Sequence, residues 1–150
     1  MPHSPSDPKS EKLKAKSLEA AFSLTNKTRG KIPNAPFDRI KNTVLGKQYE
    51  LSLAFIAPAE ARRITEETKH ADHASNVLSF PLSKNSGEIL ICPATARAQA
   101  AEYGMAPQQF LIYLFIHGLL HLKGMPHGGT MESEESRIMQ LFASRIGSVS

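Results

Sequence analysis

The pattern of apolar and polar positions predicts a series of short helices and strands along most of the chain. Apolar residues recur every three or four positions where a helix is expected, and they alternate or run together where a strand is expected. Proline near the start and glycine near the end mark the bounds of several helices. The expected elements, in chain order, are a helix over 37–45, a strand over 49–57, a helix over 58–70, strands over 76–82 and 87–93, and helices over 94–104, 106–124 and 131–147. This order predicts an α+β fold in which a small mixed sheet is covered by helices.

The N-terminal segment differs from the rest of the chain. Residues 1–34 carry prolines, serines and lysines with little periodic apolar content, which predicts a basic, flexible arm. Residues 35–150 are enough for a single domain with a real core. No apolar run approaches the roughly 20 residues that cross a bilayer, and the first residues lack the apolar middle of a signal peptide. We therefore expect a cytoplasmic protein with no membrane partner, and the single cysteine, Cys92, to be a buried strand thiol.

Charge is spread unevenly along the chain. The net charge is +4, and residues 1–50 hold ten Lys or Arg against five Asp or Glu. Residues 51–150 hold eight basic and nine acidic residues. A basic front half can steer a protein to a polyanion such as RNA, although charge alone favours a solvated polar tail as the simpler explanation.

Three histidines lie close together at the end of the long apolar helix predicted over 106–124. His117 and His121 are four residues apart, so they share one face of that helix. Gly124 allows the helix to end, and His127 follows three residues later. Three imidazoles at this spacing can converge on one ion and leave a fourth position for water or substrate, as in a catalytic zinc site. The sequence therefore predicts a metal site on a long buried helix and the turn after it.

The same histidine spacing also occurs in zinc metallopeptidases. In those enzymes the residue after the first histidine is a glutamate that acts as general base. Here that residue is Gly118, so the peptidase interpretation lacks its base and is the weaker one.

Longer motifs in this chain resemble the YbeY family of bacterial metal-dependent endoribonucleases. The segment HGLLHLKGMPH is similar to the family's H-G-x-L-H-L-x-G-Y-D-H signature, and SNVLSFP at 75–81 is similar to its T-D-V-L-S-F-P strand. GEILI at 87–91 matches the next family strand, and Gln99 with Ala100 matches a Q-A pair in the following helix. The resemblance runs from about Tyr49 to Ile146.

This resemblance implies a zincin-like fold with one zinc ion held by His117, His121 and His127. It also implies a single-strand-specific endoribonuclease that acts in maturation of the 16S rRNA 3′ end and in ribosome quality control. Ribosomal RNA and the small ribosomal subunit would be its partners, and no DNA partner is expected. A Lewis-acid ion can polarise a phosphoryl oxygen and lower the pKa of water, so a side-chain base is not required.

The phosphate also needs a cation, because negative charge builds up on it in the transition state. The family has an arginine about six residues before its T-D-V-L-S-F-P strand, and the matching residue here is Lys69. Lysine supplies a point charge without the bidentate fork of arginine. Arg62 and Arg63, about two turns earlier on the predicted helix, could extend an RNA-binding surface.

Further departures from the family pattern surround the predicted site. Met125 and Pro126 replace the Tyr-Asp pair before the third histidine, which removes an acid that could orient a ligand imidazole. Ser75 and Asn76 replace Thr-Asp ahead of the strand; they keep hydrogen-bonding capacity near RNA and lose a negative charge. These changes leave a second hypothesis open, in which the protein is a metal-stabilised RNA- or ribosome-binding factor with weakened catalysis.

Overall fold

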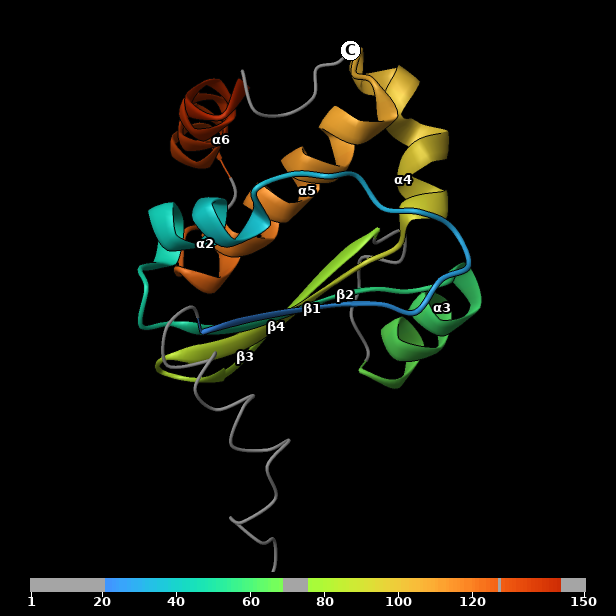
Figure 1. Ribbon diagram of the computed structural model, residues 1–150, viewed down its shortest axis with the longest axis horizontal. Coiled ribbons are helices and arrows are strands. Elements are labelled where there is room, and N and C mark those ends of the chain that lie inside the picture. Colours follow the sequence, from blue (N-terminus) through green and yellow to red (C-terminus); the bar gives the residue numbers. More distant parts are fainter. Residues whose placement is uncertain (1–20, 69–75, 127, 144–150) are drawn as a thin grey trace, which may run out of the picture.

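The computed structural model describes residues 21–68, 76–126 and 128–143. Within these ranges the strands form one four-stranded sheet, and helices lie on both of its faces (Figure 1). The strands are β1 (Phe22–Asn26), β2 (Glu50–Phe55), β3 (Val77–Ser83) and β4 (Ser86–Ile91). The helices are α2 (Phe37–Leu45), α3 (Pro58–Glu67), α4 (Pro93–Gln99), the 3-10 helix η1 (Ala100–Tyr103), α5 (Pro107–Leu122) and α6 (Gly129–Leu141).

The sheet is mixed, as predicted. Its strand order is β1-β2-β4-β3, in which β1, β2 and β4 are parallel and β3 runs antiparallel to β4. The predicted turn between the last two strands closes the hairpin, where the hydroxyl oxygens of Ser83 and Ser86 lie 2.7 Å apart. The α+β prediction is therefore confirmed at the level of a small mixed sheet covered by helices.

The strand β1 is an element that the sequence pattern does not predict. It lies at a sheet edge, with Phe22 paired to Leu51 of β2, and the N–H of Lys27 donates to the carbonyl of Phe55 at 2.8 Å. These residues fall within the predicted flexible arm, residues 1–34. Four of the five strand residues are exposed, so β1 shows no clear apolar alternation. Main-chain hydrogen bonds to β2 hold it in place, and the sheet starts well before residue 35.

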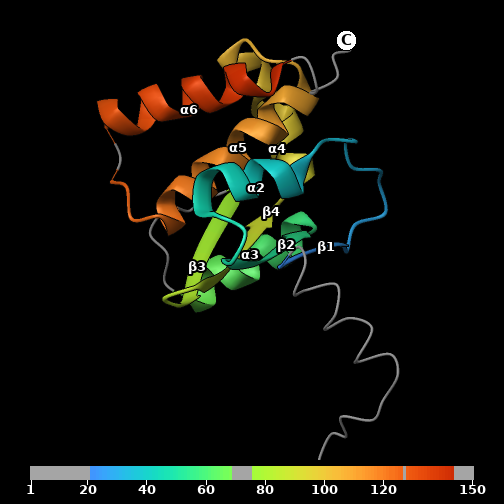
Figure 2. The ribbon, with the colours of Figure 1, turned by 60° about the vertical axis from the view of Figure 1, so that its left-hand side comes forward.

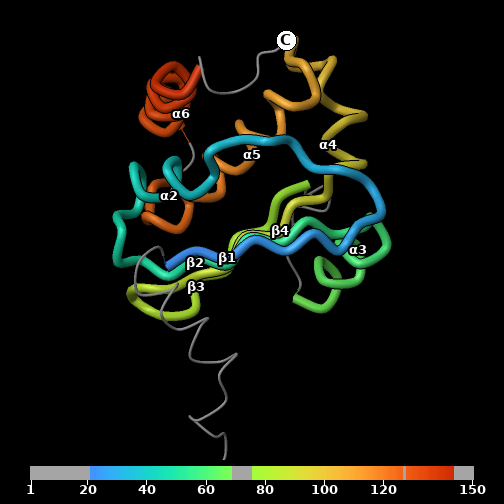
Figure 3. Tube along the Cα trace, viewed as in Figure 1, coloured from blue at the N-terminus to red at the C-terminus, as the bar shows by residue number. Residues whose placement is uncertain are grey.

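The two faces of the sheet carry different cores. In Figures 1 and 2, α2, α4, α5 and α6 lie on one face and α3 on the other, and the tube in Figure 3 shows the same layers. Because side chains alternate along a strand, Leu53 and Phe55 of β2 point into the larger core beneath α5. Ala54 points into the smaller core beneath α3, together with Cys92, which is 1% exposed as predicted for a buried thiol.

The helix α5 is the central element of the larger core. Nine of its 16 residues are buried, and it contacts β3, β4, α2, α4 and α6. Pro107 starts it, as predicted, and the side chain of Gln109 accepts a hydrogen bond from the N–H of Ala106 at 3.3 Å. Within the described part of the chain, no helix combines the length and apolar character needed to cross a membrane.

Several predicted helices have bounds that differ in the structure. The alanine-rich helix predicted over 94–104 consists of α4 and η1, and Gly104 ends it in the left-handed conformation with φ 66°. The last helix begins at Gly129, two residues earlier than predicted, and ends at Leu141 rather than at residue 147. The helix predicted over 58–70 ends at Glu67, and residues 69–75 lie outside the described ranges.

Candidate functional site

His117 and His121 lie together on one face of α5, near its C-terminal end. Their ring centroids are 4.7 Å apart and the rings are nearly perpendicular, at 79°. This confirms the prediction that the two imidazoles share a face. His127, the predicted third ligand, lies outside the described residues, and within those residues no group of three His, Cys, Asp or Glu side chains could hold a metal.

The end of α5 follows directly after this histidine pair. Gly124 has φ +98°, and its N–H donates to the carbonyl of His121 at 2.9 Å. The N–H of Met125 reaches back to the carbonyl of Leu120 at 3.0 Å. This pair of hydrogen bonds around a left-handed glycine is the Schellman motif, which ends a helix and turns the chain. Gly124 therefore has the role predicted for it and directs the chain toward α6.

A buried glutamate from α6 completes the described part of the site. Oε2 of Glu135 lies 2.5 Å from Nδ1 of His117, and Glu135 is only 4% exposed. Glu135 is not among the site residues predicted from the sequence, although the sequence contains a signal for it. It stands in the apolar stripe of α6 between Met131 and Ile138, where a carboxylate needs a specific partner.

Tyr113 belongs to the same cluster. It precedes His117 by one turn of α5, and the centroids of the two rings are 6.3 Å apart. The pKa of Tyr113 is raised to about 12; burial is the largest cause, and the interaction with the Glu135 carboxylate contributes in the same direction. One carboxylate from α6 thus interacts with both a tyrosine and a histidine from α5.

Gly118, next to His117, lies where α5 comes closest to the sheet. A Cβ atom at this position would lie 2.9 Å from Oγ of Ser79 and 3.1 Å from Cδ1 of Ile89. The hydroxyl of Ser79 also donates to the carbonyl of Gly118 at 3.3 Å. The position after the first histidine therefore faces the sheet and has no room for a glutamate. This steric limit adds to the missing general base and weighs further against a peptidase.

Asn76, a predicted RNA-binding residue, is part of the interior in this structure. It is 8% exposed, and its Nδ2 donates to Oε1 of Gln99 at 2.6 Å. The contact joins the start of β3 to the end of α4. Ser75 lies outside the described residues, so its predicted role is untested.

The predicted basic residues of α3 are not near the histidine pair. Arg63 lies 3.2 Å from Glu67 and 3.6 Å from Glu60, and its side chain is 56% exposed. Arg62 is also exposed, and α3 covers the opposite face of the sheet from α5 (Figure 1). Lys69 lies outside the described residues. The structure therefore does not bring the arginines together with His117 and His121, and their RNA-binding role stays a prediction.

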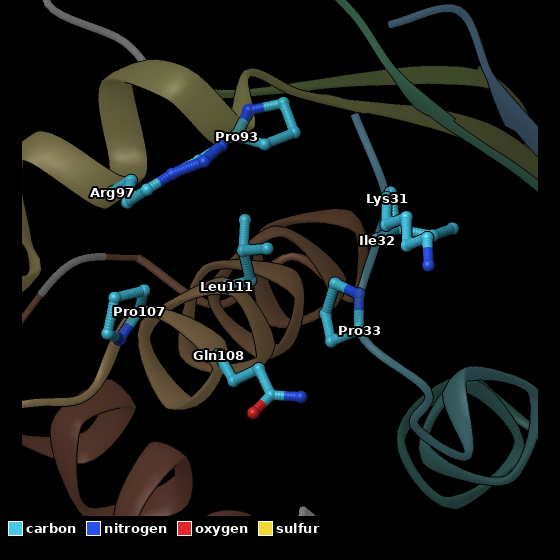
Figure 4. A pocket seen from close by; sticks show the side chains of 8 residues that line it. All are labelled: Lys31, Ile32, Pro33, Pro93, Arg97, Pro107, Gln108 and Leu111. Carbon is cyan, nitrogen blue, oxygen red and sulfur yellow. The ribbon is translucent and has the colours of Figure 1, made fainter. Parts of the chain in front are cut away.

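A pocket of about 300 Å³ opens at the other end of α5. Figure 4 shows its residues coming from three segments: the loop after β1, α4 and the first two turns of α5. Lys31 and Arg97 supply positive charge, while Ile32 and Leu111 contribute apolar surface. The pocket's α5 residues, Pro107, Gln108 and Leu111, precede His117 by six to ten residues, which is about 9 to 15 Å along the axis at a rise of about 1.5 Å per residue. The pocket is thus separate from the histidine site.

The described histidines fit a zinc site in donor type and in spacing. Two imidazoles bound to one tetrahedral zinc at about 2.1 Å have ring centroids about 5 Å apart. The observed separation of 4.7 Å is close to this value. Metal-bound histidines commonly donate their other ring nitrogen to a carboxylate, which is the arrangement of His117 and Glu135. These features are compatible with a metal centre that includes both histidines.

Comparisons with known proteins point to one family. The family model described as Endoribonuclease YbeY matches residues 18–147. The chain is 34% identical over 111 residues to the protein called Endoribonuclease YbeY from Neisseria meningitidis serogroup B, and this match covers 67% of the chain and 64% of that protein. It is 31% identical over 116 residues to the protein of the same name from Spiroplasma citri, covering 68% and 73%. The chain thus spans somewhat less than two thirds of the Neisseria protein.

A solved structure supports the fold. The solution structure of TM1509 from Thermotoga maritima superposes with a TM-score of 0.57, covering 82% of this chain and 90% of that one. At 18% sequence identity, this likeness concerns the fold alone. The family model, which matches most of the chain, together with the relatives above 30% identity, shows that the chain belongs to the YbeY endoribonuclease family.

Proposed function

We propose that this protein is a zinc-dependent endoribonuclease that cuts single-stranded ribosomal RNA, with a role at the 16S rRNA 3′ end and in ribosome quality control. In this proposal His117, His121 and His127 hold one zinc ion per chain in a zincin-like fold. The proposed partners are ribosomal RNA and the small subunit, without DNA or membrane, and the proposed location is the cytoplasm. Membership of the YbeY family supports the reaction class.

The observation that carries the proposal is the arrangement of His117, His121 and Glu135. Two imidazoles at zinc-compatible spacing lie on the helix that packs deepest in the core, and one of them contacts a buried carboxylate. A histidine that only packs in a core needs hydrogen-bond partners for its ring nitrogens, but it does not need a second imidazole beside it. A perpendicular pair beside a buried acid, followed by a glycine turn and a third histidine in sequence, favours a metal-binding role over a packing role.

The bound metal would supply Lewis-acid chemistry, polarising a phosphoryl oxygen and lowering the pKa of a water molecule. The chain's own groups position this chemistry. Glu135 would accept a hydrogen bond from the Nδ1–H of His117, which orients the ring. Gly118 lets α5 pack tightly on β3 and β4, which holds both histidines on a rigid element. In this proposal, Lys69 stabilises negative charge on the phosphate as a point charge.

The second candidate is a metal-stabilised RNA- or ribosome-binding factor with weak or no cleavage. The substitution of Met125 and Pro126 for the family's Tyr-Asp pair and the lysine at position 69 favour it. A zinc metallopeptidase is a weaker alternative, since Gly118 leaves no space for the glutamate base. Both RNA-directed candidates predict binding of zinc and of RNA, so cleavage separates them.

The deciding experiment measures cleavage of a single-stranded fragment from the 3′ end of 16S rRNA by zinc-loaded protein. Parallel reactions contain His121→Ala, a chelator, or Gln140→Ala, an exposed α6 residue that serves as the matched control. We expect cleavage by the wild type and Q140A, and none by H121A or in chelator. Fluorescence anisotropy of the same RNA should show that H121A still binds.

Intact RNA in every reaction, with zinc and RNA both bound, would overturn the nuclease proposal and establish the binding factor instead. Cleavage that persists in both H121A and chelator would show that the histidine site is not responsible. If H121A cleaves no RNA, Lys69→Ala and Lys69→Arg test the proposed phosphate contact. We expect K69A to lower the rate by about 10- to 100-fold and K69R to retain or raise it.

A further inference from the structure

Glu135 is a buried acid for which the fold alone gives no reason. It lies on the core-facing side of α6 and is 4% exposed, with Met131 and Ile138, each 1% exposed, on the same face. Burying a carboxylate is costly unless charge-assisted hydrogen bonds compensate. A methionine or leucine here would pack α6 onto α5 without that cost. The position of Glu135 therefore points to a role for the carboxylate itself.

The carboxylate is placed to determine how the His117 ring is protonated. Its Oε2 lies 2.5 Å from Nδ1 of His117, and a carboxylate can only accept a hydrogen bond. An ionised carboxylate at this place favours the tautomer of His117 with the proton on Nδ1, which puts the lone pair of the neutral ring on Nε2. A neutral imidazole binds zinc through its lone pair, so this tautomer is the one that a ligand bonded through Nε2 requires.

The carboxylate also interacts with a second residue of α5. Tyr113 lies one helical turn before His117, with the two ring centroids 6.3 Å apart, and the charge of Glu135 contributes to the raised pKa of Tyr113. Within the described ranges, no fully buried side-chain nitrogen or oxygen lacks a hydrogen-bond partner, and His117 supplies one for Glu135.

We propose that Glu135 is a positioning residue of the metal site, which fixes the ring orientation and tautomer of His117 so that Nε2 binds the metal. This inference rests on the proposed function only in taking His117 as a metal ligand. It also accounts for Pro126, where the family pattern has an acid before the third histidine. The orienting carboxylate in this chain comes from α6, through a residue that does not touch the substrate.

The test uses the full chain and three variants. Glu135→Gln keeps the size and a hydrogen-bond acceptor but removes the charge, and Glu135→Ala removes both. Glu132→Gln, one turn earlier and exposed, removes the same charge without a contact to His117 and is the matched control. Zinc affinity is measured by competition with a chromogenic chelator. We expect a loss of about 10-fold for E135Q and up to about 100-fold for E135A, and none for E132Q.

A second measurement needs neither zinc nor RNA. Long-range ¹H–¹⁵N NMR of the histidine rings reports which nitrogen carries the proton. We expect the Nδ1–H form of His117 in the metal-free wild type and in E132Q, and a shift toward the Nε2–H form in E135A. A glutamate with only a packing role would change the unfolding temperature and leave the tautomer unchanged.

The inference is overturned if E135A and E135Q bind zinc within twofold of the wild type, or if His117 is in the Nε2–H form in the wild type. Its failure differs from failure of the proposed function. Loss of zinc affinity in the Glu135 variants, with no RNA cleavage by the wild type, would leave Glu135 a positioning residue of a binding factor. Zinc-dependent cleavage by the wild type, with unchanged zinc affinity in E135A, would support the nuclease proposal and rule out a positioning role for Glu135.

Discussion

The side-chain amide of Asn76 donates a 2.6 Å hydrogen bond to Oε1 of Gln99, and this bond joins two segments that resemble separate YbeY motifs. Asn76 precedes β3, and Gln99 ends α4. The carbonyl of Asn76 also accepts from the N–H of Cys92 at 2.9 Å, just before α4 begins. Asn76 therefore fastens the entry of β3 to both ends of α4. This is a structural contact at a position that sequence alone assigns to RNA binding.

Removing either amide should cost stability, because the partner is left partly buried without its hydrogen bond. We expect Asn76→Ala and Gln99→Ala each to lower the free energy of unfolding by about 1 to 2 kcal/mol. The double variant should lose about 1 kcal/mol less than the sum of the two, because both single changes break the same bond. Urea denaturation of the three variants measures this coupling. Strict additivity would contradict the contact.

The close approach at Gly118 predicts an unusual response to alanine. Alanine in a helix interior normally stabilises by about 0.5 to 1 kcal/mol relative to glycine. At Gly118 the new methyl group would meet Ser79 and Ile89 of the sheet, so we expect G118A to lose about 1 kcal/mol or more instead. The matched control is Gly129→Ala in α6, where nothing lies within 4 Å of the added carbon.

Thermal denaturation distinguishes these outcomes. G118A should unfold at a lower temperature than the wild type, and G129A at the same or a higher one. Ser79→Ala added to G118A should recover part of the loss, because it removes the nearest atom. A G118A protein as stable as G129A would mean that α5 does not pack as closely as described.

The histidine pair is predictable from sequence because helix geometry alone determines it. Residues four apart share a face of an α-helix whatever the fold, and a glycine in the left-handed conformation ends a helix in a small number of ways. The pairing of His117 with His121 and the turn at Gly124 depend only on these local rules. Both are found as predicted.

Glu135 and β1 are not predictable in this way, because their roles depend on contacts distant in sequence. Glu135 is 18 residues from His117, and only the packing of α6 on α5 brings them together. The strand β1 is held by main-chain bonds to β2, which leave little trace in side-chain pattern. Tertiary contacts, rather than local propensity, decide both features.

Not all of the positive charge in the N-terminal half is accessible to a partner, because one of its lysines is buried. Lys41 contributes to the basic excess of residues 1–50, yet it is fully buried in the structure. Its ammonium donates to Oδ1 of Asn42 at 3.1 Å and to the carbonyl of Lys47 at 3.3 Å, and burial lowers its pKa. Lys41 therefore fastens the loop after α2 and cannot reach an RNA phosphate.

The raised pKa of Tyr113 predicts a stability change at alkaline pH. Its folded-state pKa, about 12, lies above the ordinary value of 10. The unfolded chain therefore releases this proton first, and stability from the neutral tyrosine is present below pH 10 and lost as the pH rises from 10 to 12. The stability advantage of the wild type over Tyr113→Phe should shrink across this window.

Two measurements check this prediction. Urea denaturation at a series of pH values gives the difference in unfolding free energy between the wild type and Y113F. Ultraviolet absorbance of the phenolate should show one tyrosine that ionises near pH 12, absent in Y113F and shifted downward in Glu135→Gln. Tyr103→Phe, which removes an exposed tyrosine, is the control and should retain that late step. If Tyr113 titrates at the same pH in E135Q as in the wild type, the charge of Glu135 does not contribute to its raised pKa.

The N-terminal segment can be tested without disturbing the sheet. Because β1 begins at Phe22, a deletion of residues 1–20 keeps every described strand, whereas a deletion of 1–34 would remove an edge of the sheet. Residues 1–20 carry four lysines and three acids. If all four lysines contact phosphates, the deletion should reduce the slope of log affinity against log salt by about 3 for single-stranded RNA. Fluorescence anisotropy at several salt concentrations measures this slope.

A full-length variant with the four lysines changed to glutamine separates charge from chain length. Lys9, Lys12, Lys14 and Lys16 are the residues to replace. The same reduction in slope for this variant and for the deletion would assign the effect to phosphate contacts, since a counterion-release slope depends on charge. An unchanged slope in both would mean that RNA is bound by the folded domain. The next variants would then replace exposed cations of that domain: Lys31 and Arg97 beside the pocket, and Arg62 on α3.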